Sequence, residues 1–233
     1  MTIFTAAFLP VLISLGLWQL DREQEKQALQ ALYAQRQNTA AIPLEAIDWS
    51  DADLSYTKME VTGQFDNSRY FLLDNRIREG RAGYEVLMPL FTEGGKAVIV
   101  NRGWIGQGDS RTELPSLPPL HGSVNVQGTL YVPLSEPFVL SDIQEAGSAD
   151  WPRVVQKIDI PAWSSVLDRD VVPFTMRMAQ GSPGALEASW QTINMLPEKH
   201  RGYAVQWFAM TLALVLMYLY FGMRNHPNHK EDE

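Results

Sequence analysis

The segment YAVQWFAMTLALVLMYLYF, residues 203–221, decides the class of this protein because its nineteen residues include no charged side chain. As a helix, a stretch of that length extends about 28 Å, close to the hydrocarbon thickness of a bilayer. Aromatic side chains gather near both of its ends, as they do at the two interfaces of a membrane. We therefore predict a transmembrane helix over residues 200–222 and a polar tail over residues 223–233.

The segment TIFTAAFLPVLISLGLWQL, residues 2–20, is a second uncharged stretch of the same length. A cleaved signal peptide is the alternative, but the stretch lacks a basic leader and an Ala-x-Ala site and is longer than a typical signal core. We favour an uncleaved first transmembrane helix over residues 2–20. Two spans place both termini on one side of the membrane, and the flanking charges do not settle which side.

Between the two spans the pattern changes from helical to strand-like. Residues 21–42 continue the first helix as a polar stalk, and residues 43–198 form a β-rich extramembrane domain. Short alternating or apolar runs, separated by Gly, Pro, Asn and Asp, are typical of strands and turns. The expected strands cover residues 56–65, 69–75, 83–91, 96–105, 123–132, 153–160 and 171–179, with one short helix over residues 161–168. We predict a membrane protein with two transmembrane helices flanking a mostly antiparallel β soluble domain, either a barrel or a sandwich, with minor α-helix.

Composition excludes several classes of function. The net charge of −8 and the pI near 5.0 disfavour contact with phosphate backbones, so we expect no nucleic-acid partner. The chain has no cysteine, which rules out disulfides, thiolate catalysis and cysteine-bound metal sites.

A search for catalytic motifs indicates that the protein is not an enzyme. Ser55 and Lys58 match S-x-x-K, but they lie in a strand-like segment, where positions three apart point to opposite faces. His121 lies in a proline-rich loop and is interpreted as a turn residue. His226 and His229 would bind a metal ion only weakly, and a solvated tail is the favoured interpretation.

The dipeptide Asn-Arg occurs twice at the end of an apolar run, with Arg76 in the first copy and Arg102 in the second. Trp104 follows the second copy. One interpretation is a rim of paired arginines for an acidic ligand or partner. The other, which we favour, is that these arginines connect neighbouring loops inside the domain.

Four motifs resemble those of a known family: LGLWQLDREQEK after the first span, GYEVLMPL and VNRGWI in the domain, and HRGYAVQWF at the second span. They occur in the same order in the Surfeit-locus cytochrome c oxidase assembly factors, which the chain resembles from about residue 15 to residue 221. The resemblance implies an assembly factor that helps haem a insertion or maturation of the catalytic subunit of a haem–copper oxidase. It further implies contact with the lipid bilayer, that subunit and a haem a synthesis enzyme. The alternatives are a haem-independent scaffold for the nascent subunit and a membrane-anchored periplasmic enzyme.

The resemblance also implies a location. Family members lie in the inner membrane with the domain facing the periplasm or the intermembrane space. No basic, serine-rich transit sequence precedes the first span, so we expect a multi-pass protein of a bacterial inner membrane with a periplasmic domain.

The family's candidate haem ligand, the histidine just before the second span, corresponds to His200. Many members have Asn-Asn-His-Leu here, whereas this chain has Glu-Lys-His-Arg. On a helix, His200, Tyr203, Ala204 and Trp207 lie on neighbouring positions of one side, so iron ligation by His200 beside Tyr203 and Trp207 is physically reasonable. Gln19 and Gln206 lie at the same interface and are expected to hydrogen-bond across the helices. The alternative is a histidine that reaches to interfacial water beside an aromatic belt.

Overall fold

The computed structural model describes residues 2–49, 54–108, 113–131, 150–190 and 196–224. The chain divides into two compact units, one of Met1–Ala34 with Gln191–Glu233 and one of Gln35–Trp190. The first unit is helical and the second is rich in β-sheet.

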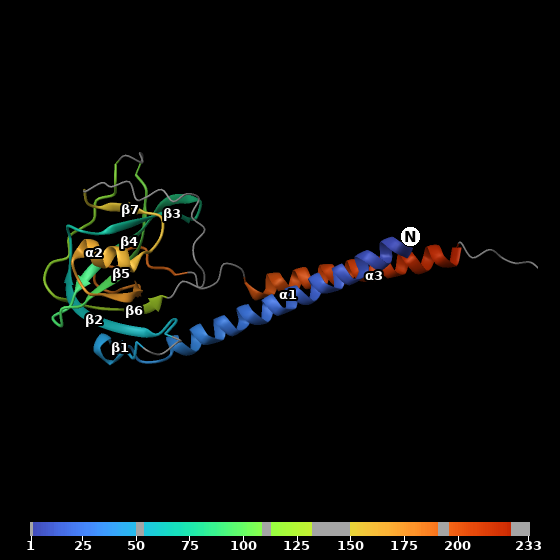
Figure 1. Ribbon diagram of the computed structural model, residues 1–233, viewed down its shortest axis with the longest axis horizontal. Helices are drawn as coiled ribbons and strands as arrows, with labels where there is room; N and C mark the ends of the chain where they lie inside the picture. The colour runs from blue at the N-terminus through green and yellow to red at the C-terminus, as the bar shows by residue number, and fades with distance from the viewer. Residues whose placement is uncertain (1, 50–53, 109–112, 132–149, 191–195, 225–233) are drawn as a thin grey trace, which may run out of the picture. The chain divides into compact units, whose positions relative to one another are not determined.

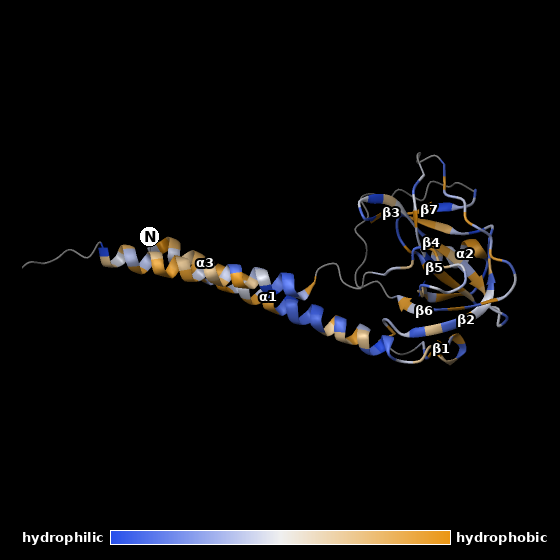
Figure 2. Cartoon of the chain, turned by 180° about the vertical axis from the view of Figure 1, so that it is seen from behind, coloured by the Kyte–Doolittle hydropathy of each residue, from blue (hydrophilic) through white to orange (hydrophobic). Residues whose placement is uncertain are grey.

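The helical unit contains the two segments that the sequence predicts as membrane spans. Helix α1 (Thr2–Gln37) continues without interruption from the apolar segment into the polar one, and α3 (Pro197–Arg224) contains the other apolar segment. Both helices are long and apolar enough to cross a membrane. Figure 2 shows hydrophobic residues along the first half of α1 and most of α3, and hydrophilic residues over the second half of α1. Many large apolar side chains are exposed there, such as Ile3 and Leu216, as lipid-facing residues would be.

Helices α1 and α3 run antiparallel and contact each other through small residues. Gly16 of α1 and Ala204 of α3 are both buried. A Cβ atom at Gly16 would lie 2.6 Å from Cε1 of Phe208, so only glycine leaves room for that ring. Small residues at such positions let membrane helices approach closely without a hydrophobic driving force.

The described residues of the second unit form eight strands and two short helices. The strands are β1 (Ile42–Pro43), β2 (Lys58–Phe65), β3 (Phe71–Arg78), β4 (Arg81–Phe91), β5 (Ala97–Gly106), β6 (Val124–Tyr131), β7 (Arg153–Val155) and β8 (Val171–Met178). The helices are η1 (Leu44–Ala46) and α2 (Ile160–Leu167). Each of the seven expected strand regions contains an observed strand, whereas β1 was not expected. Strand β7 is shorter than predicted, because the chain bends directly after Val155. Asp159 then caps α2, its side chain accepting a hydrogen bond from the Ala162 amide.

The strands form a closed barrel, which decides between the barrel and the sandwich (Figure 1). Their order is β1-β2-β6-β8-β5-β4-β3-β7, and a further pairing of β2 with β4 closes the ring. At that closure Gln64 pairs with Phe91, and Phe65 with Leu90. A Cβ atom at the adjoining Gly63 would lie 2.4 Å from the carbonyl oxygen of Phe91, so glycine permits the two strands to meet. The pairings are antiparallel except β1–β2, β3–β7 and β5–β8, and the predicted mostly antiparallel β domain between two apolar helices is confirmed.

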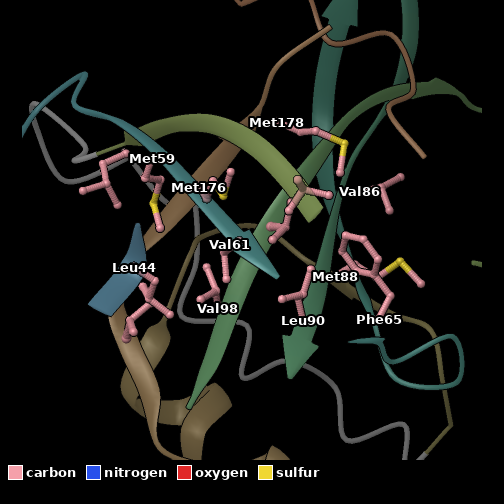
Figure 3. Close-up of a cluster of buried hydrophobic side chains, with 14 of the residues drawn as sticks. Leu44, Met59, Val61, Phe65, Val86, Met88, Leu90, Val98, Met176 and Met178 are labelled. Atoms are coloured by element: carbon pink, nitrogen blue, oxygen red, sulfur yellow. The ribbon is translucent and has the colours of Figure 1, made fainter. Parts of the chain in front are cut away.

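Methionine and branched apolar side chains fill the barrel. Met59, Met88, Met176 and Met178 are each at most 1% exposed, and Figure 3 shows them among the other side chains of this core. A second cluster lies between the sheet and α2, where the rings of Phe71 and Trp163 stack with centroids 4.1 Å apart. The two clusters explain why these strands carry apolar residues on alternating or consecutive positions.

Candidate functional site

The first turn of α3 presents His200 towards α1. The helix begins at Pro197, whose fixed φ suits a first helical position, and Glu198 follows with a negative charge near the positive end of the helix dipole. His200 is only 9% exposed, although it lies in the first turn, where backbone N–H groups lack intrahelical partners. The site therefore combines a helix start with a buried imidazole.

A hydrogen bond joins this imidazole to the other helix. Nδ1 of His200 lies 2.8 Å from Oε1 of Gln19, although the two residues are separated by 181 positions in the chain. An amide oxygen only accepts hydrogen bonds, so in this contact an N–H group at Nδ1 would be the donor and Oε1 of Gln19 the acceptor. The sequence prediction placed Gln19 correctly at the helix–helix contact but paired it with Gln206, which is exposed in the structure.

The second ring nitrogen of His200 is buried and unpaired. Nε2 has no hydrogen-bond partner among the residues that the structure describes. Buried polar side-chain atoms in proteins nearly always have a partner, so an exception calls for an explanation. With the proton on Nδ1, Nε2 of a neutral imidazole carries a lone pair, which is the form that binds a metal ion.

The other predicted residues of the site differ in their exposure. Ala204 is 1% exposed and adds no bulk next to His200, one turn further along α3. Trp207 is half-buried, and Tyr203 is 45% exposed. The structure therefore brings His200 and Ala204 into the contact between the helices, with Trp207 at its margin, and leaves much of Tyr203 on the outside of the pair.

Arg102 lies inside the barrel. It is 1% exposed, its Nε donates to the carbonyl oxygen of Gly184 at 2.7 Å, and its guanidinium carbon lies 5.8 Å from the ring centroid of Phe65. Burial lowers the pKa of the Arg102 guanidinium, and the interaction with Tyr70 acts in the opposite direction. The same burial raises the pKa of the Tyr70 hydroxyl. Arg102 is thus enclosed by protein and is not presented to a partner at the surface.

Trp104 is also an interior residue, at 8% exposure, and its indole N–H donates to the carbonyl oxygen of Arg76 at 2.7 Å. Arg76 itself is 40% exposed at its side chain, and its Nε lies 3.8 Å from a carboxylate oxygen of Glu85 on the neighbouring strand. Of the three rim candidates only Arg76 is partly exposed. These contacts favour the interpretation that the arginines connect segments within the domain.

Comparison with known proteins places the chain in a family. Residues 6–212 match the model of the SURF1 family. The chain belongs to the SURF1 family. That family is known as one of cytochrome oxidase assembly factors, so the resemblance that the sequence motifs indicated is confirmed.

The relatives of this SURF1-family chain include bacterial and animal proteins. A SURF1-like protein of Rickettsia felis is 25% identical over 218 residues, covering 91% of this chain and 92% of the relative. The Surfeit locus protein 1 of Gallus gallus is 27% identical, covering 85% and 68%, and that of Mus musculus is 25% identical, covering 91% and 72%. The family match over residues 6–212 includes most of α1, the β domain and the first part of α3.

Among the described residues of the SURF1-family chain, the remaining polar candidates do not come together as a second site. Nζ of Lys58 donates to the carbonyl oxygen of Gln37 at 3.1 Å, and His121 is exposed. His226 and His229 lie outside the described residues. Within the described part of the chain, no group of three or more His, Asp or Glu side chains is positioned to hold a bare metal ion.

The residue that sequence reasoning assigned wrongly is Gln19. Its position near the end of an uncharged helix indicated an interhelical hydrogen bond, but the partner depends on how the two helices are rotated against each other. The sequence feature that could have indicated the correct pair is the position of Gln19 at the end of the first span and of His200 at the start of the second, because these ends meet when the two spans are antiparallel. Among the described residues the resulting site has one buried imidazole nitrogen, Nε2 of His200, without a hydrogen-bond partner.

Proposed function

We propose that this protein is a membrane-anchored assembly factor for a haem–copper cytochrome c oxidase, and that it holds haem a for insertion into the catalytic subunit. Membership of the SURF1 family supports the first part of the proposal. The observation that carries the second part is the buried Nε2 atom of His200, which has no partner among the described residues. The proposal includes no catalytic step, in keeping with the names of the family and its relatives.

The residues around His200 fit one axial position of a haem. Haem iron takes a neutral histidine nitrogen as ligand, and such histidines usually donate their other N–H to a carbonyl or carboxylate. His200 makes that second contact with the amide oxygen of Gln19. Ala204 is a small residue one turn after His200, and Trp207 and Tyr203 offer aromatic surface at the margin. Bound haem supplies the iron that accepts the Nε2 lone pair, and the two helices supply an apolar boundary around it.

Absorption spectroscopy of the full-length chain tests haem binding directly. The protein is produced in a bacterial host that makes haem a, purified in lipid nanodiscs and compared with His200→Ala. We expect a Soret band at about one haem per chain that His200→Ala abolishes. His121→Ala is the matched control, because His121 is an exposed loop residue, and it should retain the band. A colourless protein that still captures the oxidase catalytic subunit would favour the haem-independent scaffold instead.

The assembly role is tested in cells. Deletion of the gene should lower oxidase activity and haem a content in the membrane while other respiratory complexes stay normal. His200→Ala should reproduce the loss of haem a if haem transfer is the function. Unchanged oxidase spectra in the deletion strain would contradict the proposal.

We further propose a bacterial inner membrane as the location, with the β domain on the periplasmic side and a haem a synthesis enzyme as the donor. Two apolar helices at the ends of the chain and the Rickettsia relatives support this proposal. Because the chain has no cysteine, single cysteines report sidedness without background. Ser123→Cys, in an exposed loop of the domain, should react with a membrane-impermeant maleimide in cells with a permeabilised outer membrane. Asn228→Cys, in the tail, should react only after the inner membrane is broken, and the reverse pattern would place the domain in the cytoplasm.

A further inference from the structure

We propose that Gln19 is a positioning residue that selects which nitrogen of His200 is the metal ligand. Its amide oxygen accepts the Nδ1 proton, and the lone pair of the neutral imidazole is thereby held on Nε2. The inference rests on the proposed function only where it concerns haem, because the position of the proton is a property of the protein alone.

The geometry explains why this contact controls the proton. The Nδ1–Oε1 separation of 2.8 Å is that of a short hydrogen bond, and the bond is partly buried between two helices, where hydrogen bonds are electrostatically stronger than in water. If Nδ1 lost its proton, its lone pair would face the amide oxygen, and an N–H at Nε2 would be buried without an acceptor among the described residues. Both changes cost free energy. The structure therefore disfavours the Nε2–H tautomer, which is the commoner form of the free side chain in water.

The helix contact holds Gln19 at this distance. Gly16 lies almost one turn before Gln19 on the same side of α1, and the ring of Phe208 occupies the space that the missing Cβ leaves. Ala204 is fully buried on the α3 side of the contact. Two small residues thus set the separation of the helices, and that separation places the glutamine oxygen within reach of the imidazole.

The bond also has a consequence for the ligand's electron density. A histidine that donates its second N–H to a strong acceptor becomes a more basic ligand, and removal of such a partner typically weakens metal binding about 10- to 100-fold. Gln19→Leu removes the acceptor while keeping an apolar side chain of similar size. Gln19→Glu keeps an acceptor and strengthens it with a negative charge.

Nuclear magnetic resonance of the haem-free full-length protein in nanodiscs tests the tautomer. The chain has four histidines, so the ¹⁵N signals of His200 are assigned by their loss in His200→Ala. In the wild-type protein we expect Nδ1 to show the shift of a protonated nitrogen and Nε2 that of an unprotonated one. Gln19→Leu should move both shifts towards the opposite tautomer, whereas Gln19→Glu should preserve the wild-type pattern. Gln206→Leu, at an exposed glutamine of α3, is the matched control and should change nothing.

A protonated Nε2 in the wild-type protein, or wild-type shifts in Gln19→Leu, would overturn the inference. Circular dichroism and gel filtration of each variant establish that the helices and the domain are intact, so a shift of the tautomer is not confused with unfolding.

Haem titration then separates the inference from the proposed function. With haem a, Gln19→Leu should bind about 10- to 100-fold more weakly and show a more positive iron reduction potential, and Gln19→Glu should show a more negative one. If no variant binds haem while the tautomer result holds, the haem function is wrong and the role of Gln19 stands. If haem binds through His200 and Gln19→Leu leaves affinity, potential and tautomer unchanged, the role of Gln19 is wrong and the haem function stands.

Discussion

Substitution of Arg102 tests what a buried cation contributes to the barrel. Arg102 is 1% exposed, and its Nε donates to the carbonyl oxygen of Gly184 at 2.7 Å. One of its terminal nitrogens lies 3.1 Å from the sulfur of Met88. No carboxylate forms an ion pair with Arg102 in the part of the chain that the structure describes. Two variants, Arg102→Ala and Arg102→Met, separate the packing of the aliphatic stem from the charge.

The magnitude follows from the contacts that each variant removes. Alanine loses two buried methylene groups, about 1.6 kcal/mol at about 0.8 kcal/mol each, and leaves a cavity. It also leaves the Gly184 oxygen without its donor, which costs about 1–3 kcal/mol. Relief of the guanidinium's desolvation offsets part of this loss, so we expect Arg102→Ala to destabilise the domain by about 2–4 kcal/mol.

Methionine keeps the apolar stem and fills most of the volume. Arg102→Met therefore avoids the cavity and most of the loss of buried methylene groups. The two free-energy terms that remain are the lost hydrogen bond to Gly184, which destabilises the domain, and the relief of the guanidinium's desolvation, which stabilises it. Replacement of buried charged groups by apolar residues of similar volume is often neutral or stabilising. We expect Arg102→Met to lie within about 1 kcal/mol of the wild-type protein.

Urea unfolding of the full chain in detergent micelles, followed by tryptophan fluorescence, measures both variants. A difference of about 3 kcal/mol corresponds to a fall in Tm of about 6–12 °C for a domain of this size. Arg78→Ala, at a more accessible arginine of β3, is the control and should change stability by less than about 1 kcal/mol. If Arg102→Met is as destabilised as Arg102→Ala, the charge and its hydrogen bonds stabilise the barrel more than packing does, and the reasoning is refuted.

Three further predictions concern other parts of the molecule. Gly16→Leu should push the Phe208 ring out of the helix contact and remove the Soret band, as is expected for His200→Ala. Leu17→Ala, at an exposed position of the same helix, should keep the band. An undiminished band in Gly16→Leu would contradict the close helix contact. Burial raises the pKa of Asp66, but hydrogen bonds donated by Ser68 and Arg69 lower it by more, so the pKa lies below the ordinary value of 3.8. One of these donors is Nε of Arg69, at 2.7 Å from the carboxylate. This carboxylate therefore stabilises the fold above pH 3.8 and loses that contribution as the pH falls through its lower folded value, so Asp66→Asn should be less stable at pH 7 and converge with the wild-type protein in acid unfolding. Trp163→Ala should lower the free energy of unfolding, measured in urea, by about 3–5 kcal/mol, because Trp163 is 1% exposed and its ring stacks on that of Phe71. A loss below about 1 kcal/mol would show that α2 contributes little to the core.

The local pattern of the sequence was sufficient for the fold class. Uncharged stretches of nineteen residues and alternating apolar runs report on secondary structure directly, because each depends on neighbouring positions in the chain. Closure of the barrel is different, since Gln64 and Phe91 come together only through the curvature of the whole sheet. The two-residue strand β1 is too short to give any pattern, so its pairing with Met59 was not predictable.

The same distinction holds for the polar residues. His200 was identifiable from its place at the start of an apolar segment and from the resemblance to a family. Its partner Gln19 was not, because the rotation of one helix against the other decides whether Gln19 meets His200 or Gln206. Arg102 and Trp104 carry the same side chains whether they line a surface or fill a core, and only their burial separates the two interpretations.

The hydrogen bond between Gln19 and His200 also bears on the order in which the protein is made. Gln19 belongs to α1 and His200 to α3, so the barrel is synthesised after one partner and before the other. Chains grow from the N-terminus, so the first helix must wait in the membrane with its glutamine unmatched until α3 emerges. The contact between Gln19 and His200 can therefore form only after the barrel has been synthesised. A nascent or truncated chain that ends between Trp190 and Pro197 contains the whole Gln35–Trp190 unit but lacks His200.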